Sequence, residues 1–89
     1  MKFLLIEGEL LSNSHLRPVD KFVLQFIRNL CKSGKSYWGD PGYLGKEFGV
    51  SQEYIMQRFD FLERAKLIKK TDHGWILEAA WFEIIGYNK

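Results

Sequence analysis

The sequence has a single cysteine, Cys31, which excludes an intrachain disulfide and a zinc site built from several cysteines. Its longest apolar run near the amino terminus, residues 3–6, is too short for a signal-peptide core or a membrane span. The two histidines, His15 and His73, stand alone in turn-like segments, and no glycine-rich phosphate-binding motif precedes a helix. These absences predict a cytoplasmic protein that is not an enzyme and has no cofactor, no metal, no small-molecule substrate and no membrane partner.

The excess of positive over negative charge is also small: the sequence has 13 lysines and arginines and 11 aspartates and glutamates, which gives a net charge of +2. That charge is too small to identify a nucleic-acid partner by itself. Apolar side chains are abundant: 46% of the residues are hydrophobic and 16% are aromatic, enough for a chain of 89 residues to bury one core. We therefore expect a single domain over residues 1–89.

The clearest local pattern predicts a helix over residues 17–32. Pro18 suits the first helical turn, where its missing N–H would have no partner, and Ser33 with Gly34 supplies a stop. Apolar residues follow at the spacing of one helical face, namely Val19, Phe22, Val23, Phe26, Ile27 and Leu30. This face is expected to pack on the core.

The rest of the chain is expected to form short strands and helices. Gly49 can adopt the left-handed conformation that ends a helix, and Ser51 can cap the next helix. The expected elements are a strand at 3–6, a brief strand at 36–38, a turn at 39–42, helices at 41–48 and 52–65, and a β-hairpin of residues 67–71 and 75–78. Residues 79–85 fit either a terminal strand or a short helix.

The stretch of residues 43–68 resembles the winged helix-turn-helix family. In that family a leucine and a small residue open the second helix, a Gly-hydrophobic-Ser turn follows, and Leu-Glu precedes the wing. The matching residues here are Leu44, Gly45, Gly49, Val50, Ser51, Ile55, Leu62, Glu63, Leu67 and Ile68. The resemblance implies a mainly α fold with a small antiparallel sheet (α+β). A three-helix core plus a β-hairpin wing would occupy residues 16–78, between an N-terminal strand or extension at 1–15 and a C-terminal extension at 79–89.

Two positions depart from the family pattern. Gly45 stands where alanine is usual, and the low helix propensity of glycine should loosen the second helix by roughly 1 kcal/mol. Lys66 stands where glycine usually precedes the wing. Within the family, residues 3–77 look most like the domain at the front of plasmid and phage replication initiators and replisome organisers. That resemblance implies a role in replication initiation or transcription regulation.

Winged helices of this kind place the third helix in the major groove of double-stranded DNA and the wing on the backbone or in the minor groove. The face of the third helix opposite its core residues would present Glu53, Met56, Gln57, Asp60 and Arg64. Glutamines suit adenine edges and arginines suit guanine or phosphate, whereas the two acids would repel phosphates. The candidate DNA-binding residues are Lys46, Ser51, Gln52, Tyr54, Gln57, Arg58, Arg64, Lys69, Lys70 and His73.

Several of these features also have a purely structural interpretation. Lys69 and Lys70 can be solvated residues that prevent edge pairing of the hairpin. The cations at the end of the first helix, Arg28, Lys32 and Lys35, can stabilise its carboxyl end. Trp38 and Trp75 are expected to pack the small strand layer against the first helix rather than to stack on bases. Because the third helix carries little positive charge, the alternative function is a winged helix that binds another protein.

A homodimer through the terminal segments is the expected assembly. A single winged helix covers little DNA, and two-fold symmetry doubles the contact. Residues 3–6 and 79–87 are too apolar for solvated tails, and Met56 and Phe61 lie off the core stripe of the third helix. These segments and side chains are the surfaces expected to meet a partner.

Overall fold

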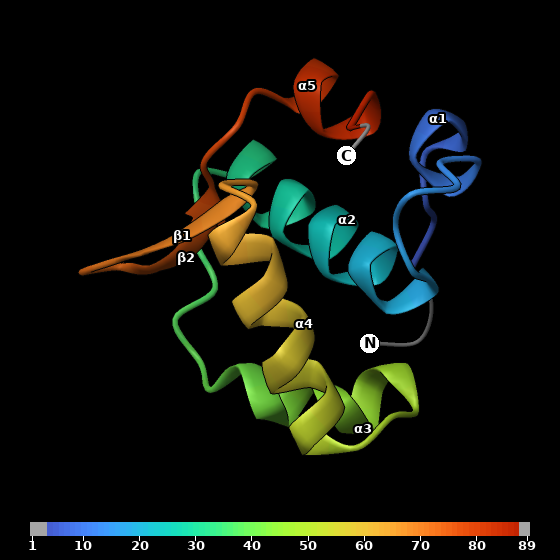
Figure 1. Cartoon of the computed structure of the whole chain (residues 1–89). Coiled ribbons are helices and arrows are strands. Elements are labelled where there is room, and N and C mark those ends of the chain that lie inside the picture. Colours follow the sequence, from blue (N-terminus) through green and yellow to red (C-terminus); the bar gives the residue numbers. More distant parts are fainter. Residues whose placement is uncertain (1–3, 88–89) are drawn as a thin grey trace.

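The computed structural model describes residues 4–87 and folds them into five α-helices, a short 3₁₀ helix and one antiparallel hairpin (Figure 1). In chain order the elements are α1 (Gly8–Leu11), α2 (Pro18–Lys32), the 3₁₀ helix η1 (Pro41–Tyr43), α3 (Leu44–Phe48), α4 (Gln52–Arg64), β1 (Ile68–Thr71), β2 (Gly74–Leu77) and α5 (Trp81–Ile85). The expected α+β class is confirmed. Within this part of the chain, no helix is both long enough and apolar enough to cross a bilayer.

Helix α2 is central to the fold, because it packs against α4 and β2 and also against α1 (Figure 1). It begins at Pro18 as predicted, and the Asp20 carboxylate accepts a hydrogen bond from the Arg17 N–H at 2.9 Å. The predicted core face is confirmed at Val19, Val23 and Ile27, which are buried. The three other members of that face, Phe22, Phe26 and Leu30, are half-buried, and Phe26 packs against the core.

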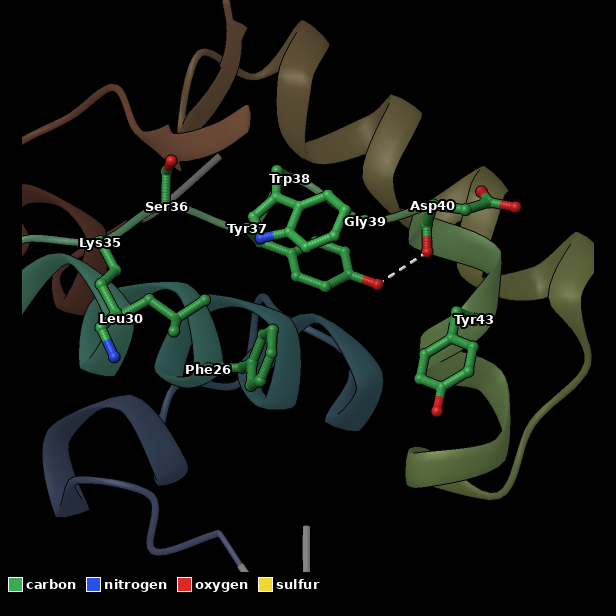
Figure 2. Close-up of a pocket in the computed structure, with 9 residues that line it drawn as sticks. All are labelled: Phe26, Leu30, Lys35, Ser36, Tyr37, Trp38, Gly39, Asp40 and Tyr43. Carbon is green, nitrogen blue, oxygen red and sulfur yellow. Dashed lines mark hydrogen bonds between the residues drawn. The ribbon is translucent and has the colours of Figure 1, made fainter. Parts of the chain in front are cut away.

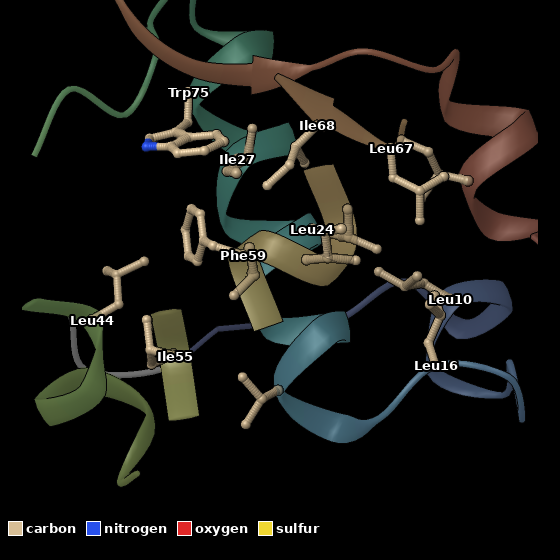
Figure 3. Close-up of a cluster of buried hydrophobic side chains, with 14 residues drawn as sticks. Leu10, Leu16, Leu24, Ile27, Leu44, Ile55, Phe59, Leu67, Ile68 and Trp75 are labelled. Carbon is tan, nitrogen blue, oxygen red and sulfur yellow. The ribbon is translucent and has the colours of Figure 1, made fainter. Parts of the chain in front are cut away.

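One hydrophobic core joins all the main elements (Figure 3). Ile55, Phe59 and Leu62 of α4 are buried in it, as their spacing predicts. Leu24 is also fully buried, although it lies outside the predicted face of α2. The reason is that α1, absent from the sequence prediction, covers α2 from another direction and contributes the fully buried Leu10.

The hairpin pairs β1 with β2 in a register that runs from Ile68 opposite Leu77 to Thr71 opposite Gly74. Tyr37 adds a third row, because its N–H donates to the Trp75 carbonyl at 3.0 Å and its carbonyl accepts from the Trp75 N–H at 2.6 Å. The brief strand expected at residues 36–38 is therefore a single bridge. This bridge attaches the segment after α2 to the hairpin.

Neither terminal segment forms a strand in the described residues. Residues 4–6 of the expected strand at 3–6 form no strand, and its remaining residue lies outside the described residues. The chain instead turns into α1, where burial of Leu10 takes the place of strand pairing. At the other end, residues 81–85 form the helix α5, with Ile84 buried against the core. Of the two structures expected for residues 79–85, strand or short helix, the chain thus forms the helix, over residues 81–85.

The two tryptophans expected to pack between the strand layer and α2 have different environments. Trp75 is buried, and its ring meets Phe59 edge-on with centroids 5.2 Å apart. Trp38 is 85% exposed, so its predicted packing is wrong. Successive side chains of an extended segment point to opposite faces, and here it is Tyr37 that faces Phe26 of α2. Trp38 is consequently directed to the solvent.

Candidate nucleic-acid interface

The corner between α3 and α4 is held by close contact of backbones. Gly49 has a φ of +73°, the left-handed conformation expected of it. The Val50 N–H donates to the Gly45 carbonyl at 2.9 Å, and a Cβ on Gly45 would lie only 2.6 Å from the Val50 carbonyl oxygen. A side chain at residue 45 would therefore push the two helices apart.

Helix α4 begins at this corner and presents a polar face to solvent. The Ser51 hydroxyl accepts a hydrogen bond from the Tyr54 N–H at 3.2 Å, so Ser51 is the predicted N-cap. Tyr54 is half-buried beside the core. The exposed side chains of α4 are Gln52, Glu53, Met56, Gln57, Asp60, Glu63 and Arg64. All five residues predicted for the outer face are among them, so that face is confirmed.

Arg58 does not join this face. Its Nε and Nη2 donate to the two carboxylate oxygens of Asp20, both at 2.7 Å, and its guanidinium carbon lies 4.4 Å from the Phe61 ring centroid. The Arg58 side chain is 12% exposed and that of Asp20 is 0% exposed. Hydrogen bonding to Asp20 raises the pKa of Arg58 despite its partial burial. Arg58, predicted as a DNA contact, thus forms an ion pair that joins α4 to α2 and lies apart from the exposed candidates.

Arg64 is placed differently, at the exposed carboxyl end of α4. Its Nε lies 3.1 Å from an Asp60 carboxylate oxygen, one helical turn earlier. Exposed pairs of this spacing contribute only about 0.3–0.5 kcal/mol, so a phosphate could compete for the guanidinium. Arg64 is therefore accessible to a ligand, whereas Arg58 is not.

The hairpin carries three more of the predicted site residues. Lys69 and Lys70 of β1 and His73 of the turn are exposed. The Thr71 hydroxyl fixes the turn by donating to the Gly74 carbonyl at 2.8 Å and accepting from the His73 N–H at 3.2 Å. Lys46, on α3, is exposed as well. The predicted site residues thus lie on α3, α4 and the hairpin.

The electrostatics of this surface vary along α4. Besides the Arg58 that is paired with α2, the helix carries three carboxylates and the Arg64 guanidinium, which gives a net charge of −2. Two of these carboxylates, Asp60 and Glu63, are in the second half of the helix. The first half presents Gln52, Gln57 and a single acid, Glu53. Hydrogen bonding to base edges is therefore feasible near the corner with α3 and unfavourable toward the other end.

Comparison with protein-family models, curated protein sequences and solved structures gives no match for this chain. Nor does the part of the chain that the structure describes contain a group of three or more His, Cys, Asp or Glu side chains that could hold a metal ion. The chemistry of the surface rests on its amides, lysines and exposed aromatic rings. Sequence reasoning missed the exposed indole of Trp38, although the alternation of side chains along residues 36–38 required either Tyr37 or Trp38 to point outward.

Proposed function

We propose that the chain is a winged helix-turn-helix domain that binds double-stranded DNA, in replication initiation or transcription regulation of a plasmid- or phage-type element. The observation that carries the proposal is the tight α3–α4 corner, in which Gly45 packs on the backbone of residue 50 and Gly49 turns the chain. The first half of α4 packs on α3 and η1 and exposes Gln52, Glu53, Met56 and Gln57. The hairpin, at the carboxyl end of α4, adds two exposed lysines (Figure 1).

In this proposal the first half of α4 enters the major groove. Only the amino-terminal residues of a recognition helix reach base edges, so the acidic second half of α4 stays outside the groove. Gln52 and Gln57 would bind adenine edges through their amides. Lys46, Lys69 and Lys70 would contact phosphates on either side, and Arg64 would exchange Asp60 for a phosphate.

The salt dependence of binding tests the proposal. Four cations that contact phosphates, the three lysines and Arg64, predict a slope of log affinity against log salt of about −3.6. Fluorescence anisotropy of a labelled duplex measures this slope. Lys69→Gln should reduce it by about one for every sequence, whereas Lys21→Gln removes an equal charge from the α1 side of α2 and should leave it unchanged. Absence of duplex binding by the wild-type protein at low salt would overturn the proposal.

Sequence preference separates base contacts from phosphate contacts. Gln57→Ala should weaken binding to the preferred duplex by about 5- to 150-fold for a lost bidentate contact and affect random duplex little. Glu63→Ala, on the same face but in the second half of α4, is the matched control and should preserve the preference. Equal losses on both duplexes for Gln57→Ala would remove α4 from base recognition.

A homodimer through the terminal segments remains part of the proposal. Leu5, Leu11 and Phe82 are large apolar side chains exposed on the segments around α1 and α5. Trp81, in contrast, is partly buried and lies under the Arg28 guanidinium. Leu5→Glu combined with Phe82→Glu should therefore yield a folded monomer in sedimentation, with weaker DNA binding. A wild-type monomer at about 100 μM, well above the Kd of a functional dimer, would contradict it.

The second candidate function is binding of another protein through α4. It is favoured by the net charge of −2 on the exposed side chains of this helix and by the exposed Met56 among them. A basic protein surface with an apolar centre would fit this face. The two functions differ in one measurement, because Glu53→Gln should strengthen DNA binding but weaken binding of a basic protein.

A further inference from the structure

A hollow lies between α2 and the segment that connects it to η1 (Figure 2). Its volume is about 440 Å³, within the range of roughly 300–1,000 Å³ that is typical of small-ligand sites. Four of its nine lining residues are aromatic, namely Phe26, Tyr37, Trp38 and Tyr43. The Lys35 side chain lies at one end of the hollow and Asp40 at the other (Figure 2).

Two of these rings are largely exposed to solvent. Trp38 is 85% exposed and Tyr43 is 61% exposed, while Phe26 and Tyr37 meet edge-on beneath them with centroids 5.3 Å apart. An exposed indole forgoes the large burial energy that an aromatic side chain can contribute. Trp38 therefore offers a wide apolar surface to a ligand rather than to the core.

The position of Trp38 ties this surface to the hairpin. Its neighbour Tyr37 exchanges backbone hydrogen bonds with Trp75, and the Ser36 hydroxyl donates to the carbonyl of His73 in the hairpin turn. The Trp38 Cα is so close to Gly74 that a Cβ on that glycine would lie 2.7 Å from it. The Trp38 backbone thus lies against the hairpin turn. This turn joins β1, which carries Lys69 and Lys70, to β2.

We propose that Trp38 stacks on an unpaired base of a single-stranded nucleic acid, whose phosphates contact Lys35 and the hairpin lysines. A nucleobase presents a flat π-face to an indole and is joined to phosphates on both sides, so it matches an exposed indole that shares its hollow with the Lys35 side chain. An apolar peptide would use the rings but not the lysines. The inference rests on the proposed function in assigning the hairpin to nucleic acid, and it adds a second binding mode at a different surface.

Binding of a 12-nucleotide single strand of thymidines tests the inference, measured by anisotropy and by quenching of tryptophan fluorescence. Trp38→Ala should weaken binding by about 5- to 150-fold, the range found for loss of one base–aromatic stack. Trp38→Phe, which keeps a ring, should lose less. Ser14→Ala is the surface control, because Ser14 is exposed in the turn between α1 and α2 and does not line the hollow, and it should bind as the wild type does.

A second probe separates base stacking from attraction to phosphates. An abasic oligomer of the same length keeps the phosphates and lacks the bases, so the wild type and Trp38→Ala should bind it equally. Because Trp38 is solvent-exposed, circular dichroism of the variant should match the wild type. Equal affinity of the wild type and Trp38→Ala for the thymidine strand would overturn the inference, as would failure of the wild type to bind it.

The same titrations keep this inference distinct from the proposed function. Duplex binding that depends on Gln57, without any binding of the thymidine strand, would overturn the Trp38 site alone. Single-strand binding that depends on Trp38, without duplex binding, would support the Trp38 site and overturn the proposed role of α4.

Discussion

Lys66 ends α4 in a backbone conformation that favours glycine. Its φ is +62°, and among the described residues it is the sole residue other than glycine with a positive φ. The Lys66 N–H donates to the Glu63 carbonyl and the Leu67 N–H donates to the Leu62 carbonyl, both at 3.0 Å. Helix α2 ends in the same hydrogen-bonding pattern around Gly34, whose φ is +72°. The chain thus contains one helix end with the favoured residue and one without it.

Lys66→Gly should stabilise the protein. A side chain in the left-handed region costs about 1–2 kcal/mol, and glycine offsets part of this gain by about 0.5–1 kcal/mol through the greater freedom of the unfolded chain. Lys66 is exposed, so its replacement sacrifices no buried contact. We expect the free energy of unfolding to increase by about 0.5–1 kcal/mol, which corresponds to a rise in Tm of about 2–8 °C for a chain of this size.

Urea unfolding followed by circular dichroism measures this change. Lys66→Ala is the control, because it removes the charge but keeps a Cβ, and it should leave the stability near that of the wild type. Gly34→Ala should show the reverse effect at α2, a loss of about 1 kcal/mol. A Lys66→Gly protein no more stable than Lys66→Ala would refute the reasoning, since the backbone strain would then contribute nothing.

Three further substitutions probe the fold. Gly45→Ala should destabilise the protein by about 1–3 kcal/mol in thermal unfolding, because the new Cβ would meet the Val50 carbonyl. Helix propensity alone favours alanine by about 1 kcal/mol, so a stabilised variant would contradict the close packing of the corner. Arg58→Met should cost about 3–5 kcal/mol in urea unfolding by leaving the buried Asp20 carboxylate without its counter-charge, and adding Asp20→Asn should restore part of the loss. Hydrogen bonds from Gln25, Trp81 and Arg28 lower the pKa of Glu7, so the stability they confer is present above its ordinary pKa of 4.5 and is lost as the pH falls through the lowered value. Glu7→Gln should therefore lose less stability than the wild type below about pH 4.5 in acid unfolding. An unchanged acid transition would exclude this role of Glu7.

The sequence predicted the elements whose boundaries are set by local chemistry. Pro18 and Ser51 mark helix starts because each satisfies or removes an orphan N–H of the first turn, and Gly49 marks an end because it can adopt a positive φ. The core face of α4 followed from the helical period alone. Features of this kind depend on residues close in the chain, so a single sequence contains them.

The features that the sequence missed depend on contacts between distant residues. Helix α1 is a single turn without a period of its own, and it is stabilised by packing of its buried Leu10 with α2 and α5. Arg58 was assigned to DNA because arginine on a third helix suits that role, but its partner Asp20 lies 38 residues earlier. No local pattern reports such a pairing. For the same reason, neither Arg58 nor Trp38 could be placed correctly before the fold was known.

The Asp20 carboxylate has a consequence for the order in which the fold opens. It accepts hydrogen bonds from the Arg17 backbone at the start of α2 and from Arg58 in the middle of α4. If α4 moves away, Asp20 loses its counter-charge and must regain water, so the first turn of α2 has to open with it. The amides of these two helical segments should then exchange their hydrogens with solvent in one cooperative unit, later than those of the exposed hairpin turn.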